Sequence, residues 1–266
     1  MIGQGISFTQ SFSGSPLVLS ISVSYYEYMQ NVFSGKKALV VGGTGGLGSL
    51  VSSGLADRGA HIVCVGRHGS PVEYPSGPDR TFLALDLDKS GNRDIVLQEA
   101  RSADILCVVR GPFLQKPVHD TSEDQWLSIV FDNLTFPGML VSSVLPHMMS
   151  RQWGRILLFG GTRTDRIRGF STNAAYAAAK TGLSSLVRSV SEEYARFGIT
   201  CNALCPGLAE TEYLDGEVLK ALERKNPDGK AVTREEIARA AMFLLENSAC
   251  NGVILPVDKA WRPTFV

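Results

Sequence analysis

Short runs of apolar residues alternate with longer amphipathic stretches from residue 36 onward. The short runs predict strands at 38–41, 61–65, 81–85, 105–109, 156–159, 200–204 and 253–257. The longer stretches predict helices at 47–58, 93–102, 123–144, 174–197 and 235–246. Strands and helices in this alternation are typical of right-handed βαβ units around a parallel sheet. The pattern therefore predicts one α/β domain with a doubly wound parallel sheet of about seven strands.

Two segments depart from this alternation. Residues 1–35 carry no Lys or Arg, so they match neither a secretory signal nor a transit peptide. We interpret 1–35 as an extension of the domain at 36–266, either an arm or hairpin that packs on the domain or on a partner subunit, or a partly disordered leader. The segment 67–80 is rich in Gly and Pro, which predicts a short or missing helix after the second strand.

Composition excludes several function classes. The 266-residue chain balances 26 Lys and Arg against 26 Asp and Glu, which argues against nucleic acid or an anionic membrane as a partner. No apolar stretch approaches the roughly 20 uninterrupted residues of a membrane span. The five cysteines form no CxxC and no zinc-ligand spacing, so they predict reduced thiols, no metal site and a cytoplasmic location.

A glycine-rich turn joins the first predicted strand to the first predicted helix. Glycine lets the backbone approach a pyrophosphate, and the start of the helix offers free N–H groups to the phosphates. This position between a strand and a helix predicts a dinucleotide site. The predicted cofactor-binding residues of the turn are Gly42, Thr44, Gly46, Leu47 and Gly48.

The end of the second predicted strand bears on the choice between NAD(H) and NADP(H). A carboxylate there would bind the 2′-hydroxyl of the adenosine ribose, but the chain reads Val65-Gly66-Arg67-His68. A guanidinium can hold a 2′-phosphate, so Arg67 favours NADP(H) over NAD(H). Asp86, after the third strand, is the predicted neighbour of the adenine ring. The alternatives are a solvated Arg67 and a helix-cap or turn role for Asp86.

Tyr176 and Lys180 lie four residues apart in an alanine-rich stretch that predicts a helix. This spacing places both on one helix face, after the fifth strand, where ligands bind in such folds. A nearby ammonium, together with an oxidised nicotinamide, is expected to lower the pKa of the phenol from its usual value of about 10. Tyr176 would then exchange a proton with a carbonyl or alcohol oxygen. A solvent-facing helix stripe is the alternative.

Several motifs follow one another along 36–266: Gly42-xxx-Gly46-x-Gly48, Asp86, Asn133, Tyr176-xxx-Lys180, Asn202, Pro206-Gly207 and Thr211. In this order they resemble the short-chain dehydrogenase/reductase family. The resemblance implies a Rossmann-type fold, an NAD(P)(H) cofactor and a homotetramer or homodimer.

The resemblance also implies roles for individual residues. Tyr176 would be the catalytic acid/base, and Lys180 would hold the nicotinamide ribose and lower the pKa of the tyrosine. Asn133 would anchor a water-mediated proton relay. Pro206-Gly207 and Thr211 would lie along the nicotinamide carboxamide.

The segment after the fourth strand departs from the family pattern. The family usually has Asn-Asn-Ala-Gly, whereas this chain has Val108-Val109-Arg110-Gly111. Arg110 places a charge close to the predicted nicotinamide site. It would meet an anionic substrate, pair with an acid or reach outward to solvent.

The catalytic serine of the family also has no clear counterpart. Counting back about thirteen residues from the tyrosine gives Arg163, whereas aligning forward from the strand at 156–159 gives Gly161. Thr162 or Thr164 would supply the missing hydrogen bond to the carbonyl oxygen, with Thr162 as our candidate; otherwise no side chain does so. The loss of one such donor costs several kcal/mol of transition-state stabilisation.

Two further segments bear on the substrate. Arg163, Arg166 and Arg168 either recognise a carboxylate, a phosphate or an acidic carrier protein, or belong to a solvated loop. The segment 211–233 is short, and its apolar residues predict a modest lid: Tyr213, Leu214, Val218 and Leu219.

The sequence favours an NADP(H)-dependent enzyme that interconverts a small-molecule ketone or aldehyde and an alcohol. By motif its nearest relatives would be carbonyl or 3-oxoacyl-carrier reductases. The alternative is a cofactor-binding sensor or scaffold with weak or no catalysis. The altered residues at the serine and Asn-Asn-Ala-Gly positions favour this alternative. A redox-neutral lyase or dehalogenase is less favoured, because the glycine loop suits a dinucleotide.

Overall fold

Seven strands form one parallel sheet in the part of the chain that the computed structural model describes, residues 31–67, 79–209, 220, 223–224 and 226–261. The order across the sheet is β3-β2-β1-β4-β5-β6-β7, and every neighbouring pair is parallel. The predicted doubly wound sheet is therefore confirmed. The strands are β1 (Lys37–Val41), β2 (His61–Gly66), β3 (Arg80–Ala84), β4 (Ile105–Val108), β5 (Gly154–Phe159), β6 (Ile199–Pro206) and β7 (Ile254–Val257).

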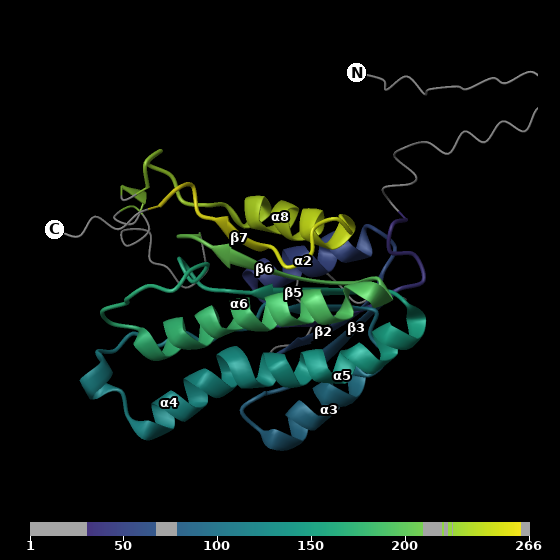
Figure 1. Ribbon diagram of the computed structural model, residues 1–266, viewed down its shortest axis with the longest axis horizontal. Coiled ribbons are helices and arrows are strands. Elements are labelled where there is room, and N and C mark those ends of the chain that lie inside the picture. The colour runs from purple at the N-terminus through teal and green to yellow at the C-terminus, as the bar shows by residue number, and fades with distance from the viewer. Residues whose placement is uncertain (1–30, 68–78, 210–219, 221–222, 225, 262–266) are drawn as a thin grey trace, which may run out of the picture.

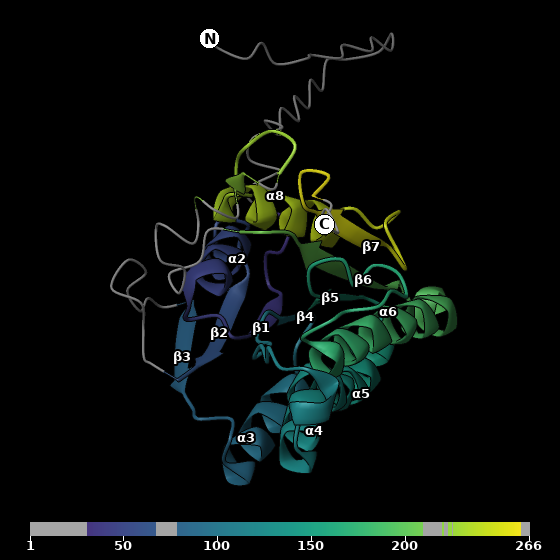
Figure 2. The same cartoon turned by 90° about the vertical axis from the view of Figure 1, so that its left-hand side faces the viewer.

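Helices cover both faces of the sheet, as Figures 1 and 2 show. One layer contains α2 (Gly46–Ala56) and α8 (Arg234–Glu246). The opposite layer contains α3 (Ser90–Ala100), α4 (Glu123–Val130), α5 (Phe136–Arg151) and α6 (Ala174–Tyr194). Short helical turns occur at η1 (Val118–Asp120) and η3 (Ala195–Phe197).

The predicted helix at 123–144 differs from the observed structure in two ways. It continues to Arg151, and the π-helical turn η2 (Phe131–Thr135) separates α4 from α5. Ser122 begins α4 with a capping box, because its hydroxyl accepts from the N–H of Gln125 while the Gln125 side chain accepts from the N–H of Ser122. A π-turn inside a helical segment often marks a functional site, and this one carries Asn133.

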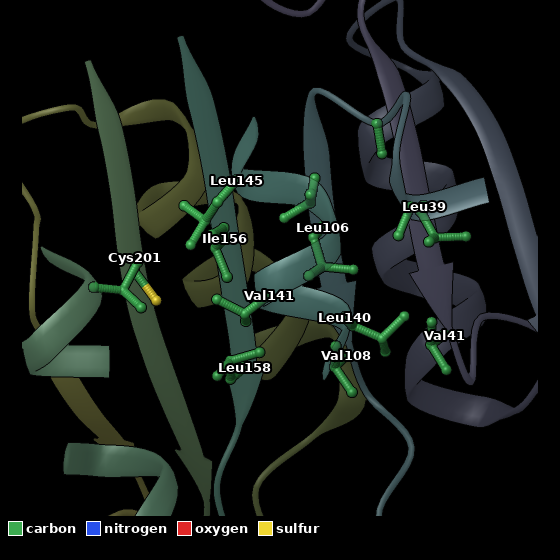
Figure 3. Packing of buried hydrophobic residues seen from close by; sticks show 14 of the residues in the cluster. Leu39, Val41, Leu106, Val108, Leu140, Val141, Leu145, Ile156, Leu158 and Cys201 are labelled. Carbon is green, nitrogen blue, oxygen red and sulfur yellow. The ribbon is translucent and has the colours of Figure 1, made fainter. Parts of the chain in front are cut away.

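Strand side chains alternate between two apolar clusters, one on each face of the sheet. Leu39 and Val41 face α3, α5 and α6, where they belong to the cluster drawn in Figure 3. Ala38 and Val40 belong to the other cluster, which is completed by α2 and α8. Cover on both faces explains why these strands are continuously apolar. The thiols are free, and those of Cys64, Cys107, Cys201 and Cys205 are buried, as predicted for core cysteines.

The helical stretch Glu123–Arg151 has the length and the apolar composition that a membrane span would need. Its α5 part nevertheless packs against the sheet, although Leu127 in α4 is exposed. Phe136, Leu140, Val144 and Met148 are all buried in the cluster between α5 and the strands. This stretch is therefore the core helix of a globular domain.

The described end of the N-terminal segment packs on the domain. Phe33 is buried, its N–H donates to the carbonyl of Arg58 at 2.9 Å, and its ring meets Trp153 edge to face. Residues 1–30, and therefore most of the predicted extension, lie outside the described residues. The segment 68–78, where we predicted a short or missing helix, also lies outside them.

Candidate active site

The candidate site lies where parallel strands β1, β4, β5 and β6 end at the same edge of the sheet. The strand order reverses between β1 and β4, and ligands of doubly wound sheets bind at such a switch point. The segments that follow these strands contain the glycine loop, Arg110-Gly111, the loop that begins at Gly160, and Gly207.

The backbone of the glycine loop approaches its own helix so closely that side chains are excluded. Gly42 has a φ of +86°, and its N–H donates to the carbonyl of Val65 at 2.8 Å. A Cβ on Gly48 would lie 1.9 Å from the carbonyl oxygen of Gly42. Gly45 caps α2 without a side-chain hydrogen bond, so the first N–H groups of α2 keep their capacity to bind an anion. This cradle fits a pyrophosphate.

The end of β2 lies directly against the glycine loop. A Cβ on Gly66 would come within 1.7 Å of the Thr44 hydroxyl oxygen, so only glycine fits there. The next residue, Arg67, is exposed beside the loop. Asp86 accepts a hydrogen bond from the N–H of Asp88 at 3.2 Å, which is a turn role. Its contact with adenine stays a prediction.

Lys180 and Asn133 are buried together behind Gly111. Lys180 is 2% exposed and donates to the carbonyl of Phe159 at 2.7 Å. Asn133 is fully buried, and its Nδ2 donates to the carbonyls of Pro112 and Ile129, both at 3.0 Å. A Cβ on Gly111 would lie 2.5 Å from Lys180 Nζ and 2.9 Å from Asn133 Oδ1. Gly111, the family glycine that this chain retains, therefore lets both side chains pack against its backbone.

The Oδ1 atom of Asn133 has no hydrogen-bond partner in the described part of the chain. A buried acceptor without a partner costs about 1–3 kcal/mol, so such an atom is typical of a position that awaits a donor. Its place beside Lys180 suits the family role of anchoring a water in a proton relay. That role stays a prediction.

Burial shifts the pKa values of the predicted catalytic pair in the directions that favour their neutral forms. It raises the pKa of Tyr176 to about 12 and lowers the pKa of Lys180 to about 8. In the protein alone, desolvation is the largest cause of the raised pKa of Tyr176, and Cys205 adds to it. Lys180 Nζ lies 6.0 Å from the centre of the Tyr176 ring and donates to the carbonyl of Phe159. The lowering expected from Lys180 together with a bound oxidised nicotinamide stays a prediction.

The buried Lys180 predicts a pH-dependent stability. Its folded pKa of about 8 lies below the unfolded value of 10.5, so the unfolded chain binds more protons between these values and stability rises with pH there. Lys180→Met lacks this contribution. As the pH rises from about 7 to 9.5, the free energy of unfolding of wild type should therefore increase by about 2 kcal/mol relative to that of Lys180→Met. Urea unfolding of both proteins across this range measures the difference, and a constant difference would contradict a depressed Lys180 pKa.

Glycine occupies the position that faces the phenol. A Cβ on Gly161 would lie 3.0 Å from the Tyr176 hydroxyl oxygen, so the alignment from the strand identifies the serine position better than the count back from the tyrosine. Thr164 is buried and bonds with the backbone of Gly161 as both donor and acceptor. Thr162 donates to the carbonyl of Pro206 at 3.0 Å. The predicted catalytic role of Thr162 requires its hydroxyl to leave that partner.

The Pro206-Gly207 turn is held by the C-terminal segment. The N–H of Gly207 donates to the carbonyl of Val257 at 2.9 Å, and a Cβ on Gly207 would lie 2.6 Å from the Cα of Asp258. Contact of this turn with nicotinamide stays a prediction. Thr211, the apolar residues of the predicted lid and His68 lie outside the described residues.

Arg110 pairs with acids, which was one of its three predicted roles. Its guanidinium lies 3.2 Å from Asp132 and 3.1 Å from Asp88. Asp132 is 8% exposed and precedes Asn133 in η2. This ion pair ties the end of β4 to the turn that carries Asn133. The sequence contained a signal for Asp132, an acid beside a motif residue, that our prediction missed.

The arginines between β5 and α6 also have partners. Arg166 and Arg168 lie 3.3 Å and 3.5 Å from Asp165. Arg163 has a φ of +63° and lies over the Trp261 ring, 5.8 Å from its centre. These contacts favour the predicted loop over a site for an anionic substrate.

Phe113 is a site residue that the sequence analysis missed. It is 58% exposed, and its ring meets that of Tyr176 edge to face at 5.0 Å between centres. Nothing in the sequence distinguishes Phe113 from any other loop aromatic. Among the described residues no group of three His, Cys, Asp or Glu side chains is placed to hold a metal ion.

Comparison with known proteins agrees with this geometry. Residues 42–260 match a family model described as enoyl-(acyl carrier protein) reductase. The 3-oxoacyl-(acyl-carrier-protein) reductase of Escherichia coli K12 is 30% identical over 227 residues, which cover 82% of this chain and 92% of the relative. The 2-dehydro-3-deoxy-D-gluconate 5-dehydrogenase of Pseudoalteromonas atlantica is 31% identical over 246 residues, 85% of this chain and 96% of the relative.

Solved structures show the same fold. A short-chain dehydrogenase/reductase family protein, 26% identical, superposes with a TM-score of 0.74 over 85% of this chain and 97% of that chain. A Beutenbergia cavernae protein, described as a candidate NAD(P)-dependent gluconate 5-dehydrogenase with bound NADP at low occupancy, is 26% identical with a TM-score of 0.74 over 86% and 97% of the two chains.

The chain belongs to the short-chain dehydrogenase/reductase family. It is an NAD(P)-dependent oxidoreductase that acts on CH–OH or carbonyl groups.

Proposed function

We propose that the protein is an NADP(H)-dependent reductase of a ketone or aldehyde, with Tyr176 as its acid/base. The proposal is supported by one observation: the glycine loop and Tyr176 lie at the same edge of the sheet, and Lys180 and Asn133 are buried near Tyr176. The cradle fits a dinucleotide because side chains are excluded at Gly48 and Gly66. The bound nicotinamide supplies or accepts the hydride.

Each residue of the site has a defined task in this proposal. Tyr176 gives its hydroxyl proton to the carbonyl oxygen and, in the reverse direction, takes a proton from the alcohol. Burial keeps the phenol protonated, which suits a proton donor for reduction. Lys180 Nζ can donate three hydrogen bonds. It donates one to the carbonyl of Phe159 and would donate another to the nicotinamide ribose. Asn133 Oδ1 receives the water that restores the proton of Tyr176.

Arg67 is expected to select NADP(H). It follows β2 beside the glycine loop, where its guanidinium would pair with the 2′-phosphate. Arg67→Ala should weaken NADPH binding about tenfold or more and leave NADH binding nearly unchanged, because a hydrogen bond to a charged group contributes about 1.5–3 kcal/mol. Isothermal titration with both cofactors measures this. Equal losses for NADPH and NADH would contradict a 2′-phosphate contact.

A panel of small ketones and aldehydes with NADPH tests the function itself. We expect oxidation of NADPH, followed by its absorbance, in step with the appearance of the alcohol. The alternative, a cofactor-binding sensor or scaffold, is favoured by one observation, the glycine that replaces a hydroxyl residue beside Tyr176. NADPH binding without turnover of any carbonyl would favour that alternative.

The remaining expectations belong to the same proposal. A homotetramer or homodimer and a cytoplasmic location stay predictions. The small-molecule substrate is a carbonyl compound or an alcohol, and neither nucleic acid nor a membrane is required. Light scattering coupled to size exclusion gives the oligomeric state.

A further inference from the structure

Two residues on different loops bound the phenol of Tyr176. Phe113, after β4, places its ring edge to face with the tyrosine ring, and Gly161, after β5, leaves the phenol in contact with backbone. The two loops are joined by a β-bridge between Lys116 and Asn173. The phenol is thus flanked by an aromatic ring and by a position without a side chain.

Several polar groups of the second loop have partners within the protein. The hydroxyls of Thr162 and Thr164 donate to backbone carbonyls. The nearby cations Arg166 and Arg168 pair with Asp165. The hydroxyls of Thr162 and Thr164 are therefore not free to donate to a polar substituent beside the reacting carbonyl, and such a substituent loses water at a cost unless it finds another donor.

Phe113 offers the opposite chemistry. Its side chain is 58% exposed, which leaves most of an aromatic ring available to an apolar ligand beside the catalytic hydroxyl. Burial of apolar surface is favourable in proportion to its area, and a ring pair adds to it.

We propose that the exposed ring of Phe113 forms a subsite for an apolar, flat group attached to the carbonyl carbon, so that aryl ketones and aldehydes are preferred substrates. This inference rests on the proposed carbonyl reduction and specifies its substrate class. Phe113 is the ring that contacts the substituent, and it does not transfer the proton.

Kinetics with two ketones test the subsite. Acetophenone carries the aryl group and acetone lacks it. We expect wild type to reduce acetophenone with the higher kcat/KM, and Phe113→Ala to lower that value about tenfold more than the value for acetone, a difference of 1.4 kcal/mol. Phe243→Ala is the matched control, because Phe243 is 53% exposed on α8.

A binding measurement separates this inference from the proposed function. Saturation-transfer NMR with the NADP⁺-loaded protein should show the ring protons of acetophenone in contact with wild type and with Phe243→Ala, and a signal reduced severalfold with Phe113→Ala. If Phe113→Ala lowers kcat/KM equally for acetone and acetophenone, the subsite is refuted while carbonyl reduction stands. If no ketone is turned over but the NMR contact depends on Phe113, the proposed reaction fails and the subsite stands. An NMR signal independent of Phe113 would overturn the subsite in either case.

Discussion

Tyr176→Phe is expected to lower kcat/KM for carbonyl reduction by about 10²–10⁴-fold, the usual contribution of a positioned general acid. The substitution removes only the hydroxyl, so the edge-to-face contact with Phe113 and the packing of α6 are retained. NADPH affinity should stay nearly the same, because Lys180 and the glycine loop are untouched. Initial rates at saturating NADPH, together with titration of the cofactor, measure both quantities.

Tyr194→Phe is the matched control, since Tyr194 ends the same helix and packs on Phe197 away from the strand ends. It should retain wild-type rates. Undiminished turnover by Tyr176→Phe would remove the tyrosine from its role as acid/base. Loss of NADPH binding in that variant would show that the phenol acts through the cofactor site instead.

Gly48→Ala is expected to weaken NADPH binding about 100-fold, a loss of about 2.8 kcal/mol of binding free energy. The added Cβ would lie 1.9 Å from the carbonyl oxygen of Gly42, and neither a Cβ nor a backbone oxygen can rotate away. Either the first turn of α2 or Gly42 must move, and both hold the cradle. Fluorescence titration with NADPH measures the change in affinity.

Gly138→Ala provides the control for the effect of an extra methyl group. Gly138 lies in α5, and the nearest atom to its added Cβ is 4.0 Å away. This variant should bind NADPH as wild type does and unfold at the same or a slightly higher temperature, because alanine favours a helix over glycine. Equal affinity of Gly48→Ala and wild type would mean that the glycine loop does not hold the pyrophosphate.

The sequence was sufficient to predict most of the sheet. A strand covered on both faces is continuously apolar, so the apolar run marks where the strand begins and ends. Ile105–Val108 and Gly154–Phe159 are clear examples. It was less informative about helix boundaries. The turn at Phe131–Thr135 was not predicted, because the helical pattern at 123–144 carries no Gly or Pro at 131–135.

The candidate site was predictable where two residues are close in space because they belong to the same helix or turn. Tyr176 and Lys180 are close because they share a helix, and the glycine loop is defined by its place between strand and helix. Contacts between loops were not predictable. The partners of Arg110 and the ring of Phe113 beside Tyr176 depend on how three loops fold together.

The pKa of Tyr176 shows a further limit of sequence reasoning. The sequence shows that a cation lies four residues from the phenol, but it does not show the desolvation that raises the pKa of Tyr176 in the protein alone. Burial is a property of the whole fold, so a pair of residues four positions apart does not reveal it.

Transfer of deuterium from NADPH labelled at the hydride position of the nicotinamide tests the central claim most directly. The protein is mixed with stoichiometric labelled NADPH and a carbonyl substrate, and the alcohol is analysed by NMR. We predict deuterium on the carbinol carbon with wild type and a rate reduced about 10²–10⁴-fold with Tyr176→Phe. Tight binding of NADPH with no deuterium in the alcohol from any ketone or aldehyde tried would contradict the account.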